Sequence, residues 1–474
     1  MIRLDDLVAA DPGLEVRGPV HEGRYARFCF DSRLVEDGDL FVAVRTQRGD
    51  GHDHIADAVA RGARAVLVDD PNTVPDGTPA LVAGDTVSTM ERYGAYVVRA
   101  WGPRVVAVTG TVGKTGTKEL VADVLATRFT VFRTPGNYSG RFGLAVALGG
   151  LRPEHEVAVV EMATGHFGEI DAMCAMAPPE VGVVTAVGAA HLVALGDVDG
   201  VAREKGALVA HLPPTGLAVL NGDDPRVLAL APRSPAPVVT VGTGPDAGYR
   251  AEDVVVGPSG TTCVCGHDGW RATVTVPWLG AHTAQAALVG LAVADHFGVD
   301  RAAAVDAIGR VAGVPGRLRP LAGADGSLIL DDTYNAAPRS VMAALETLRD
   351  LPLADEGHKR FAVLGDMREL GDDTKRMHAE VGAKAAACAD VLIFVGELMT
   401  EAERAAKIAG ADEGHVFHFA NANEAGRFVQ ERLKEGDAVL VKGSRAMEME
   451  RIVKELMAEP MRAGELLVKA HADW

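Results

Sequence analysis

The sequence predicts an α/β protein with three domains. Apolar runs of the kind found in buried parallel strands alternate with helical patterns along most of the chain. A length of 474 residues corresponds to three domains of ~150 residues each. Hydrophobic residues make up 48% and charged residues 24%, a balance that is typical of globular proteins and argues against general disorder.

The first domain is expected over residues 1–98. Apolar runs predict strands at 40–44 and 65–70, and an amphipathic pattern predicts a helix at 54–62. The segment Trp101-Gly102-Pro103 follows. Because Gly and Pro interrupt regular structure, we interpret this segment as a boundary.

The central domain, residues 99–313, is expected to hold a doubly wound parallel sheet. Buried strands are predicted at 105–110, 157–162, 181–187 and 216–224. Between about 230 and 278 the pattern changes to alternation, and the runs 261–265 and 271–276 on either side of Gly266-His267-Asp268-Gly269 predict a small β-hairpin. A helix is expected at 282–298.

The third domain, residues 314–474, is expected to be a Rossmann-like α/β unit. Its strands are predicted at 328–332, 360–366, 391–396 and 438–444.

Charge and composition restrict the partners. With 47 Lys and Arg against 65 Asp and Glu, the net charge of −18 argues against nucleic acid as a ligand. The N-terminus is acidic where a signal peptide needs a basic start, and no run approaches the ~20 apolar residues of a membrane span. Five scattered cysteines fit a reducing compartment. We expect a cytoplasmic monomer that does not insert into membranes.

The sharpest local motif is a glycine-rich loop between a predicted strand and helix, Gly110-Thr111-Val112-Gly113-Lys114-Thr115. Its glycines let backbone amides approach phosphate oxygens, and the helix N-terminus adds a positive dipole. Lys114 would reach the β- and γ-phosphates, and Thr115 would place its hydroxyl on Mg²⁺. The longer P-loop pattern has a further glycine where this chain has Val108, so this is a shorter variant, and a plain glycine-rich turn is the alternative. The loop alone leaves GTPase, helicase, kinase and ligase open.

Spaced segments along almost the full chain resemble the Mur ligase family, most closely its MurF branch. In the first two predicted domains they are Asp31-Ser32-Arg33, 38–44, Asp50-Gly51-His52, Gly62-Ala63, 110–119, 134–137, Glu161, 168–170, 190–192 and 204–206. In the third they are Gly316-Arg317, DDTYNAAPRS (331–340), VLGDMREL (363–370) with His378, and VKGSRAMEME (441–450). The resemblance implies an ATP-dependent amide ligase of peptidoglycan synthesis that works through an acyl phosphate. Its substrates would be a nucleotide-linked peptide acid, UDP-N-acetylmuramoyl-tripeptide, and an amine, D-alanyl-D-alanine.

The resemblance also implies roles for individual residues. The nucleotide would be held by Gly110, Thr111, Gly113, Lys114, Thr115, Asn137, Arg317, Asp332, Tyr334 and Asn335. The Mg²⁺ ligands would be Thr115, Glu161, His191 and Lys205, the last as a carbamate formed with CO₂, and Lys114, Glu161, His191 and Lys205 would be catalytic. The UDP part of the substrate would contact Ser32, Arg33, Asp50, Gly51 and His52.

Several of these residues have a structural interpretation as well. Without the resemblance, Lys205 is an ordinary solvated helix residue, and the turn at 50–52 is plain loop chemistry. His378 is at least as suited to ordering the 363–370 loop as to catalysis. Cys263-x-Cys265 with His267 lacks an evident fourth zinc ligand, so a hairpin is the preferred interpretation.

The chain departs from the family pattern at positions that contact the base and the acyl substrate. Ser139 and Gly140 replace adjacent asparagines, Ala286 replaces the adenine-contacting Asn, and Ala186, Ala207, Ala337 and Arg339 are further changes. The preferred nucleotide base and the substrates are therefore open. A paralogue that uses the same chemistry on another acid and amine, and a nucleotide-binding partner subunit with little turnover, remain alternatives.

Overall fold

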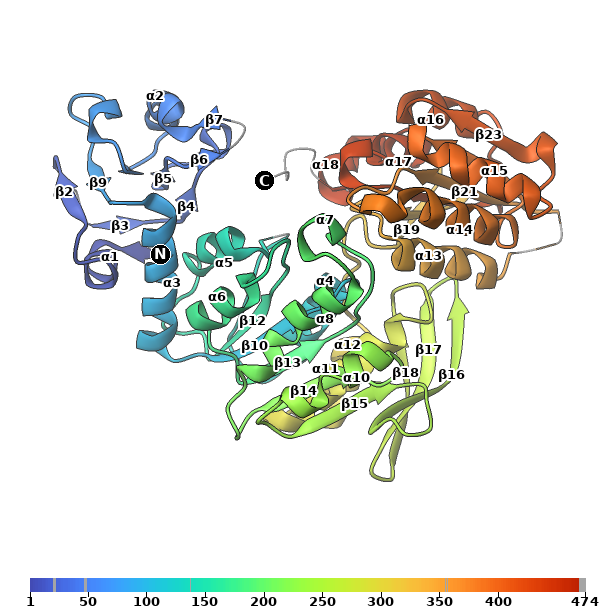
Figure 1. Ribbon diagram of the computed structural model, residues 1–474, viewed down its shortest axis with the longest axis horizontal. Helices are drawn as coiled ribbons and strands as arrows, with labels where there is room; N and C mark the ends of the chain where they lie inside the picture. Colours follow the sequence, from blue (N-terminus) through green and yellow to red (C-terminus); the bar gives the residue numbers. More distant parts are fainter. Residues whose placement is uncertain (20–22, 47–48, 137, 354, 356, 469–474) are drawn as a thin grey trace.

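The computed structural model describes residues 1–19, 23–46, 49–136, 138–353, 355 and 357–468. Three sheets with their helices lie side by side, with the central one between the other two (Figure 1). This confirms the predicted three-domain α/β class. The exact domain limits at 98/99 and 313/314 stay predictions.

The first sheet has five strands. Their order is β2 (Glu15–Arg17), β9 (Ala80–Val82), β8 (Ala65–Val68), β5 (Leu40–Val42) and β4 (Phe28–Cys29). Only β2 runs antiparallel to its neighbour. The short pairs are β1 (Ile2–Arg3) with β3 (Arg24–Tyr25) and β6 (Arg45–Thr46) with β7 (Gly49–Asp50). The helices are α1 (Leu4–Ala10), α2 (Ile55–Ala60) and α3 (Thr86–Trp101).

Helix α3 connects this unit to the central one. It begins with an Asp85 side-chain cap and ends at Gly102, whose φ of +66° suits glycine. Met90, Tyr93 and Val97 pack in one hydrophobic cluster with side chains of α5 and α6 from the central unit. The two units therefore share buried apolar surface.

The central sheet has nine strands. Their order is β11 (Val131–Arg133), β12 (Val157–Glu161), β10 (Arg104–Thr109), β13 (Val181–Val184), β14 (Leu217–Asn221), β15 (Val238–Gly242), β16 (Tyr249–Gly257), β17 (Gly260–His267) and β18 (Trp270–Val276). Strands β11 to β16 are parallel to their neighbours, and β16, β17 and β18 are antiparallel. The predicted hairpin is β17–β18, and it extends the parallel sheet rather than standing apart from it.

Helices cover both faces of this sheet. They are α4 (Lys114–Leu125), α5 (Arg141–Leu148), α6 (Glu169–Met176), α7 (Leu192–Leu195), α8 (Val198–Lys205), α9 (Ala207–Ala210), α10 (Pro225–Leu228), α11 (Thr283–Phe297) and α12 (Arg301–Ile308). α4, α11 and α12 pack in one hydrophobic cluster, and α3, α5 and α6 in another. Alternate residues of β10 join the two clusters, as expected of a strand buried on both faces.

The third sheet has six strands. Their order is β19 (Arg319–Ala322), β20 (Leu328–Asp332), β24 (Ala438–Lys442), β21 (Arg360–Gly365), β22 (Val391–Val395) and β23 (Val416–Phe419), with only β19 antiparallel. The helices are α13 (Pro338–Asp350), α14 (Thr374–Ala386), α15 (Thr400–Ile408), α16 (Ala422–Gln430), α17 (Glu450–Leu456) and α18 (Ala463–Leu466).

Two further features bear on the sequence predictions. Within the described part of the chain, no helix is both long and apolar enough to cross a membrane. All five cysteines, Cys29, Cys174, Cys263, Cys265 and Cys388, are buried free thiols. Cys263 and Cys265 lie on one face of β17 with their sulfur atoms 3.6 Å apart.

Candidate functional site

The glycine-rich loop lies at the carboxyl end of β10. Gly110 has φ +149°, and a Cβ there would collide with the Thr185 hydroxyl, so the loop requires glycine at this position. Gly113, with φ +84°, precedes the first residue of α4, Lys114. The Lys114 ammonium donates to the carbonyl of Gly110 at 2.9 Å and of Thr111 at 3.3 Å. The positive group thus curls over the loop at a helix N-terminus.

A charged cluster surrounds this loop. It comprises Lys114, Glu161, Lys205, Arg317, Asp332 and Lys442. Burial lowers the pKa of Lys114, which nearby Glu161 counteracts and Arg317 reinforces. Burial, and then the positive charge of Lys114, lower the pKa of Lys205 to about 7. A substantial fraction of the Lys205 amine is therefore neutral near pH 7.

Glu161 ends β12 within this cluster, and its side chain is 3% exposed. Its Oε2 is buried and has no hydrogen-bond partner among the described residues. A buried carboxylate oxygen without a partner costs free energy unless a cation occupies the space beside it. Lys205, the last residue of α8, is also 3% exposed. Of the two, the Glu161 carboxylate is a hard oxygen donor of the kind that divalent cations such as Mg²⁺ prefer.

Arg317, Asp332 and Lys442 bring the third sheet to the loop. The Arg317 guanidinium stacks on the Tyr334 ring at 3.9 Å and donates to the Thr115 hydroxyl at 3.4 Å. Lys442 forms an ion pair with Asp332 at 2.7 Å and donates to the carbonyl of Asn335 at 2.8 Å. Burial lowers the pKa of Lys442, and Asp332 opposes this shift.

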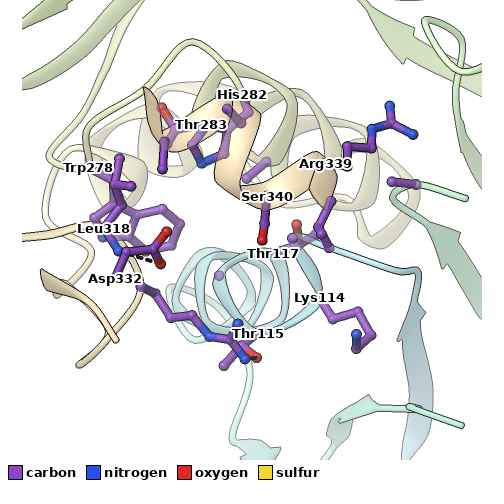
Figure 2. A pocket seen from close by; sticks show the side chains of 18 of the residues that line it. Lys114, Thr115, Thr117, Trp278, His282, Thr283, Leu318, Asp332, Arg339 and Ser340 are labelled. Atoms are coloured by element: carbon purple, nitrogen blue, oxygen red, sulfur yellow. Dashed lines mark hydrogen bonds between the residues drawn. The ribbon is translucent and has the colours of Figure 1, made fainter. Parts of the chain in front are cut away.

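A cavity of about 240 Å³ lies between α4 and the third unit, chiefly its helix α13 (Figure 2). It brings together the predicted residues Thr111, Gly113, Lys114, Thr115, Arg317, Asp332 and Asn335. It also has a neutral wall, formed by Trp278, Leu279, Ala286, Ala337, Ala343 and Ala344. The Trp278 ring packs against α4 at Gly116, where a Cβ would lie 3.3 Å from the ring. Glycine at 116 therefore allows the tryptophan to form this wall.

Arg339, at the start of α13, links the cavity to the central sheet. Its guanidinium donates to the carbonyl of Val187 at 3.1 Å and forms an ion pair with the buried Asp224. The Asp224 carboxylate also accepts from the backbone amides of Val187 and Arg226. One carboxylate therefore connects β14, the 187 loop and α13.

His191 is placed differently from the other predicted metal ligands. Its Nδ1 lies 2.8 Å from Oε2 of Glu369, in the 363–370 loop of the third domain. Among the described residues, no group of three or more His, Cys, Asp or Glu side chains could hold a metal ion. The other three predicted ligands, Thr115, Glu161 and Lys205, lie in or around the glycine-rich loop. His191 instead contacts a residue of the third domain.

The predicted UDP contacts lie in the first unit. Arg33 is exposed and pairs with Asp31 at 2.6 Å, beside the buried Ser32. Asp50 accepts from the His52 amide, and the His52 ring, 2% exposed, lies between Asp50 and Asp69. The His52 ring therefore also has the structural role that plain loop chemistry implies. A Cβ at Gly51 would lie 2.6 Å from the Val44 amide. Asn137 lies outside the described residues.

His378 orders its loop, as the structural interpretation predicted. Its Nε2 accepts from the Met367 amide at 3.0 Å, and its Nδ1 lies 2.7 Å from the Thr374 carbonyl. These partners require a neutral ring with the proton on Nδ1. Burial lowers its pKa, in agreement with that state.

A second cavity, of about 400 Å³, lies in the third unit at the carboxyl ends of its parallel strands. Charged side chains of both signs line it, namely Asp366, Arg368, Glu397, Glu448 and Arg451. Sequence reasoning did not select this cavity, nor Lys442, Trp278 or Asp224. Lys442 is the last residue of an apolar run. Because ligands bind at the carboxyl ends of parallel strands, this position in the sequence could have identified it.

Comparisons with known proteins agree with this geometry. The model of the Mur ligase family catalytic domain matches residues 26–105, that of the Mur ligase middle domain matches 108–294, and that of the Mur ligase glutamate ligase domain matches 316–445. The UDP-N-acetylmuramoyl-tripeptide--D-alanyl-D-alanine ligase of Bacillus subtilis is 31% identical over 434 residues, covering 91% of this chain and 93% of the relative. The chain belongs to the Mur ligase family.

Other Mur ligases support the assignment. The ligase of the same name from Escherichia coli is 33% identical over 90% of this chain and 92% of its own. A crystal structure of MurF from Acinetobacter baumannii matches with a TM-score of 0.83 at 29% identity, covering 97% of this chain and 98% of that one. A MurF ligase structure from Thermotoga maritima in complex with ADP matches with a TM-score of 0.77 at 29% identity, covering 92% and 98%. The predictions of Mur membership and of an ATP-dependent ligase are confirmed.

Proposed function

We propose that this Mur ligase joins D-alanyl-D-alanine to UDP-N-acetylmuramoyl-tripeptide through an acyl phosphate made from ATP. The observation that carries the proposal is that relatives named for this reaction match nine-tenths of the chain at 31–33% identity. The charged cluster supports it chemically. A carboxylate and an amine do not condense in water, so the acid must first be phosphorylated, and cations must neutralise the phosphoryl group in transfer.

In this proposal the cavity holds ATP. Lys114, Thr115 and Arg317 bind its phosphates, with the backbone amides of the 110–113 loop. Asp332 and Asn335 bind the ribose, and Lys442 fixes both through its ion pair and hydrogen bond. Tyr334 supports Arg317 by stacking. The third domain thereby contributes to a site that excludes water from a hydrolysable intermediate.

The same proposal places Mg²⁺ beside Thr115, Glu161, His191 and Lys205. The buried, unpartnered Oε2 of Glu161 supports this location. When bound, Mg²⁺ would withdraw charge from the phosphate oxygens and the acyl carboxylate. The Lys205 amine adds to CO₂ and releases a proton, which gives a carbamate. Burial and the positive charge of Lys114 both favour the neutral amine, and the charge of Lys114 also favours the anionic product.

The remaining substrates occupy the other two domains. The UDP part contacts Ser32, Arg33 and the turn 50–52. D-alanyl-D-alanine is a zwitterion at neutral pH. The second cavity is our candidate for its site, because side chains of both charges line it, with Arg368 paired to Asp366 and Arg451 paired to Glu448.

A second candidate function is favoured by one observation. The neutral wall carries Ala286 and Ala337 where the family pattern has polar side chains. A paralogue that ligates another acid and amine by the same chemistry would retain the charged cluster and change such contacts. The two candidate functions share the same reaction class and differ only in their substrates.

The decisive experiment incubates the purified chain with ATP, Mg²⁺, UDP-N-acetylmuramoyl-tripeptide and D-alanyl-D-alanine. We expect phosphate release that depends on both substrates, and a product heavier than the acid by one dehydrated dipeptide in mass spectrometry. Lys114→Ala should abolish both signals. Lys375→Ala, which removes an exposed lysine of α14, is the matched control and should retain them. Nucleotide binding without product would reject these substrates and favour the paralogue, to be pursued with a panel of other acids and amines.

A further inference from the structure

The segment that carries His191 is docked on the third domain at several points. Arg339 donates to the carbonyl of Val187. Ala189 and Leu192 pack against the hydrophobic cluster formed around α13 and α14. His191 itself meets Glu369. The position of this histidine is therefore set by the third domain as well as by its own loop.

The loop that carries Glu369 is fixed on both sides of that residue. The Met367 amide donates to His378 at 3.0 Å, and the Arg368 amide donates to the Ser444 hydroxyl at 2.9 Å. The Leu370 side chain is buried. These contacts hold the backbone before and after Glu369 in place.

Both partners have left-handed backbones. His191 has φ +52° and Glu369 has φ +64°, a region that residues other than glycine rarely adopt. Such conformations persist only where surrounding contacts impose them, and they concentrate at functional sites. The Glu369 side chain is 64% exposed and that of His191 is 41% exposed, so neither residue is needed to fill a hydrophobic core. Two unfavourable backbones that meet in one ion pair indicate a functional constraint.

We propose that Glu369 is a positioning residue that orients His191 as a metal ligand across the domain interface. The proposal rests on the proposed function, which implies the Mg²⁺. The Glu369 carboxylate accepts a hydrogen bond from Nδ1–H of His191, which leaves the lone pair of Nε2 for a cation. A carboxylate hydrogen-bonded to Nδ1 fixes the ring and makes Nε2 a better electron-pair donor. This matters because histidine is an unusual ligand for Mg²⁺. The third domain would thus fix the ring of a histidine that belongs to the central domain.

The alternative is a plain interdomain ion pair that would have to break before His191 could bind metal. The two arrangements predict opposite effects of removing the carboxylate. If Glu369 orients the ring, metal affinity falls without it. If Glu369 competes for the ring, metal affinity is unchanged or rises.

The test measures Mn²⁺ binding to the full-length protein at saturating ADP, by the electron paramagnetic resonance signal of free Mn²⁺. We expect the Kd for Mn²⁺ to rise about 10-fold in Glu369→Gln, the lower end of effects seen when the hydrogen-bond partner of a ligand is removed. Asp372→Asn, which removes an exposed charge from the short 3-10 helix Gly371–Asp373 after this loop, should leave the Kd unchanged. In the His191→Ala background, Glu369→Gln should have no further effect, because Glu369 acts through His191.

An unchanged or lower Kd in Glu369→Gln would overturn the inference, as would additive effects in the double variant. The proposed function would still stand if the wild-type protein bound Mn²⁺ and formed the ligated product. Wild-type protein that binds ADP but neither Mn²⁺ nor substrates productively would overturn the proposed function and this inference together.

Discussion

The charged cluster and the neutral wall border the same cavity, yet they differ in what a substitution costs. In the charged cluster, Lys442 is a buried cation that depends on its ion pair with Asp332, and Glu161 is a buried carboxylate beside the cation of Lys114. Removing one partner leaves a buried charge uncompensated, which is strongly unfavourable. In the neutral wall, an alanine in place of an asparagine loses one hydrogen bond, worth ~1 kcal/mol net. The residues that determine the reaction class therefore do not tolerate single substitutions. The residues that determine base or substrate preference do tolerate them.

Lys205 gives the severest test of this comparison. Lys205→Ala removes the amine that would carry the carbamate, so we expect ligation to fall by at least about 100-fold. Wild-type protein stripped of CO₂ should regain activity on addition of bicarbonate, and the variant should not. Phosphate release measures both effects. Full activity of the variant would show that the charged cluster tolerates a single substitution. That result would contradict the difference drawn between the charged cluster and the neutral wall.

Arg339 lies where the third domain meets the cavity, and its effect should be intermediate. Arg339→Ala removes a charge-assisted hydrogen bond worth ~1.5 kcal/mol, so kcat/KM for ATP should fall about 10-fold. Asp224 is buried and loses its ion-pair partner but keeps its backbone amide donors, so the melting temperature should fall by only a few degrees. Arg349→Ala on the same helix is the control. Equal losses in both variants would assign the effect to helix α13 as a whole.

Ala286 should show the smallest effect, and in the opposite direction. Ala286→Asn restores an amide to the neutral wall, so we expect the KM for ATP to fall about 5-fold, corresponding to one hydrogen bond of ~1 kcal/mol. Ala286→Val adds volume without a polar group and should not lower the KM. If both variants raise the KM, the small alanine side chain is needed to leave room for the nucleotide, and no hydrogen bond is missing at this position.

Much of the fold could be predicted because its signals are local. The continuous apolar runs at 105–110 and 438–444 correspond to β10 and β24, and the alternating run before Gly266 corresponds to β17. The attachment of the hairpin to the parallel sheet could not be predicted, because it depends on pairing of β16 with β15. Short strands such as β4 and β23 carry too few residues to show a period.

The site divides in the same way. Gly110, Lys114 and Thr115 follow a strand directly, so their sequence spacing fixes their geometry. The contacts of His191 with Glu369, and of Arg339 with Asp224, join residues more than a hundred positions apart. Nothing in the sequence near either residue identifies its partner. The contact of His52 with Asp69 was likewise outside what local spacing encodes, whereas its contact with Asp50 is local.

The five buried thiols have a practical consequence for measuring how the three domains move. Burial raises the pKa of Cys29 to about 11 and that of Cys174 to about 12, so at neutral pH neither presents a reactive thiolate. Because all five thiols are buried, maleimide dyes should discriminate strongly in favour of a cysteine introduced on the surface. A donor and acceptor pair, one on the first sheet and one on the third, could report closure on ATP binding by energy transfer, in a chain whose native cysteines are all kept.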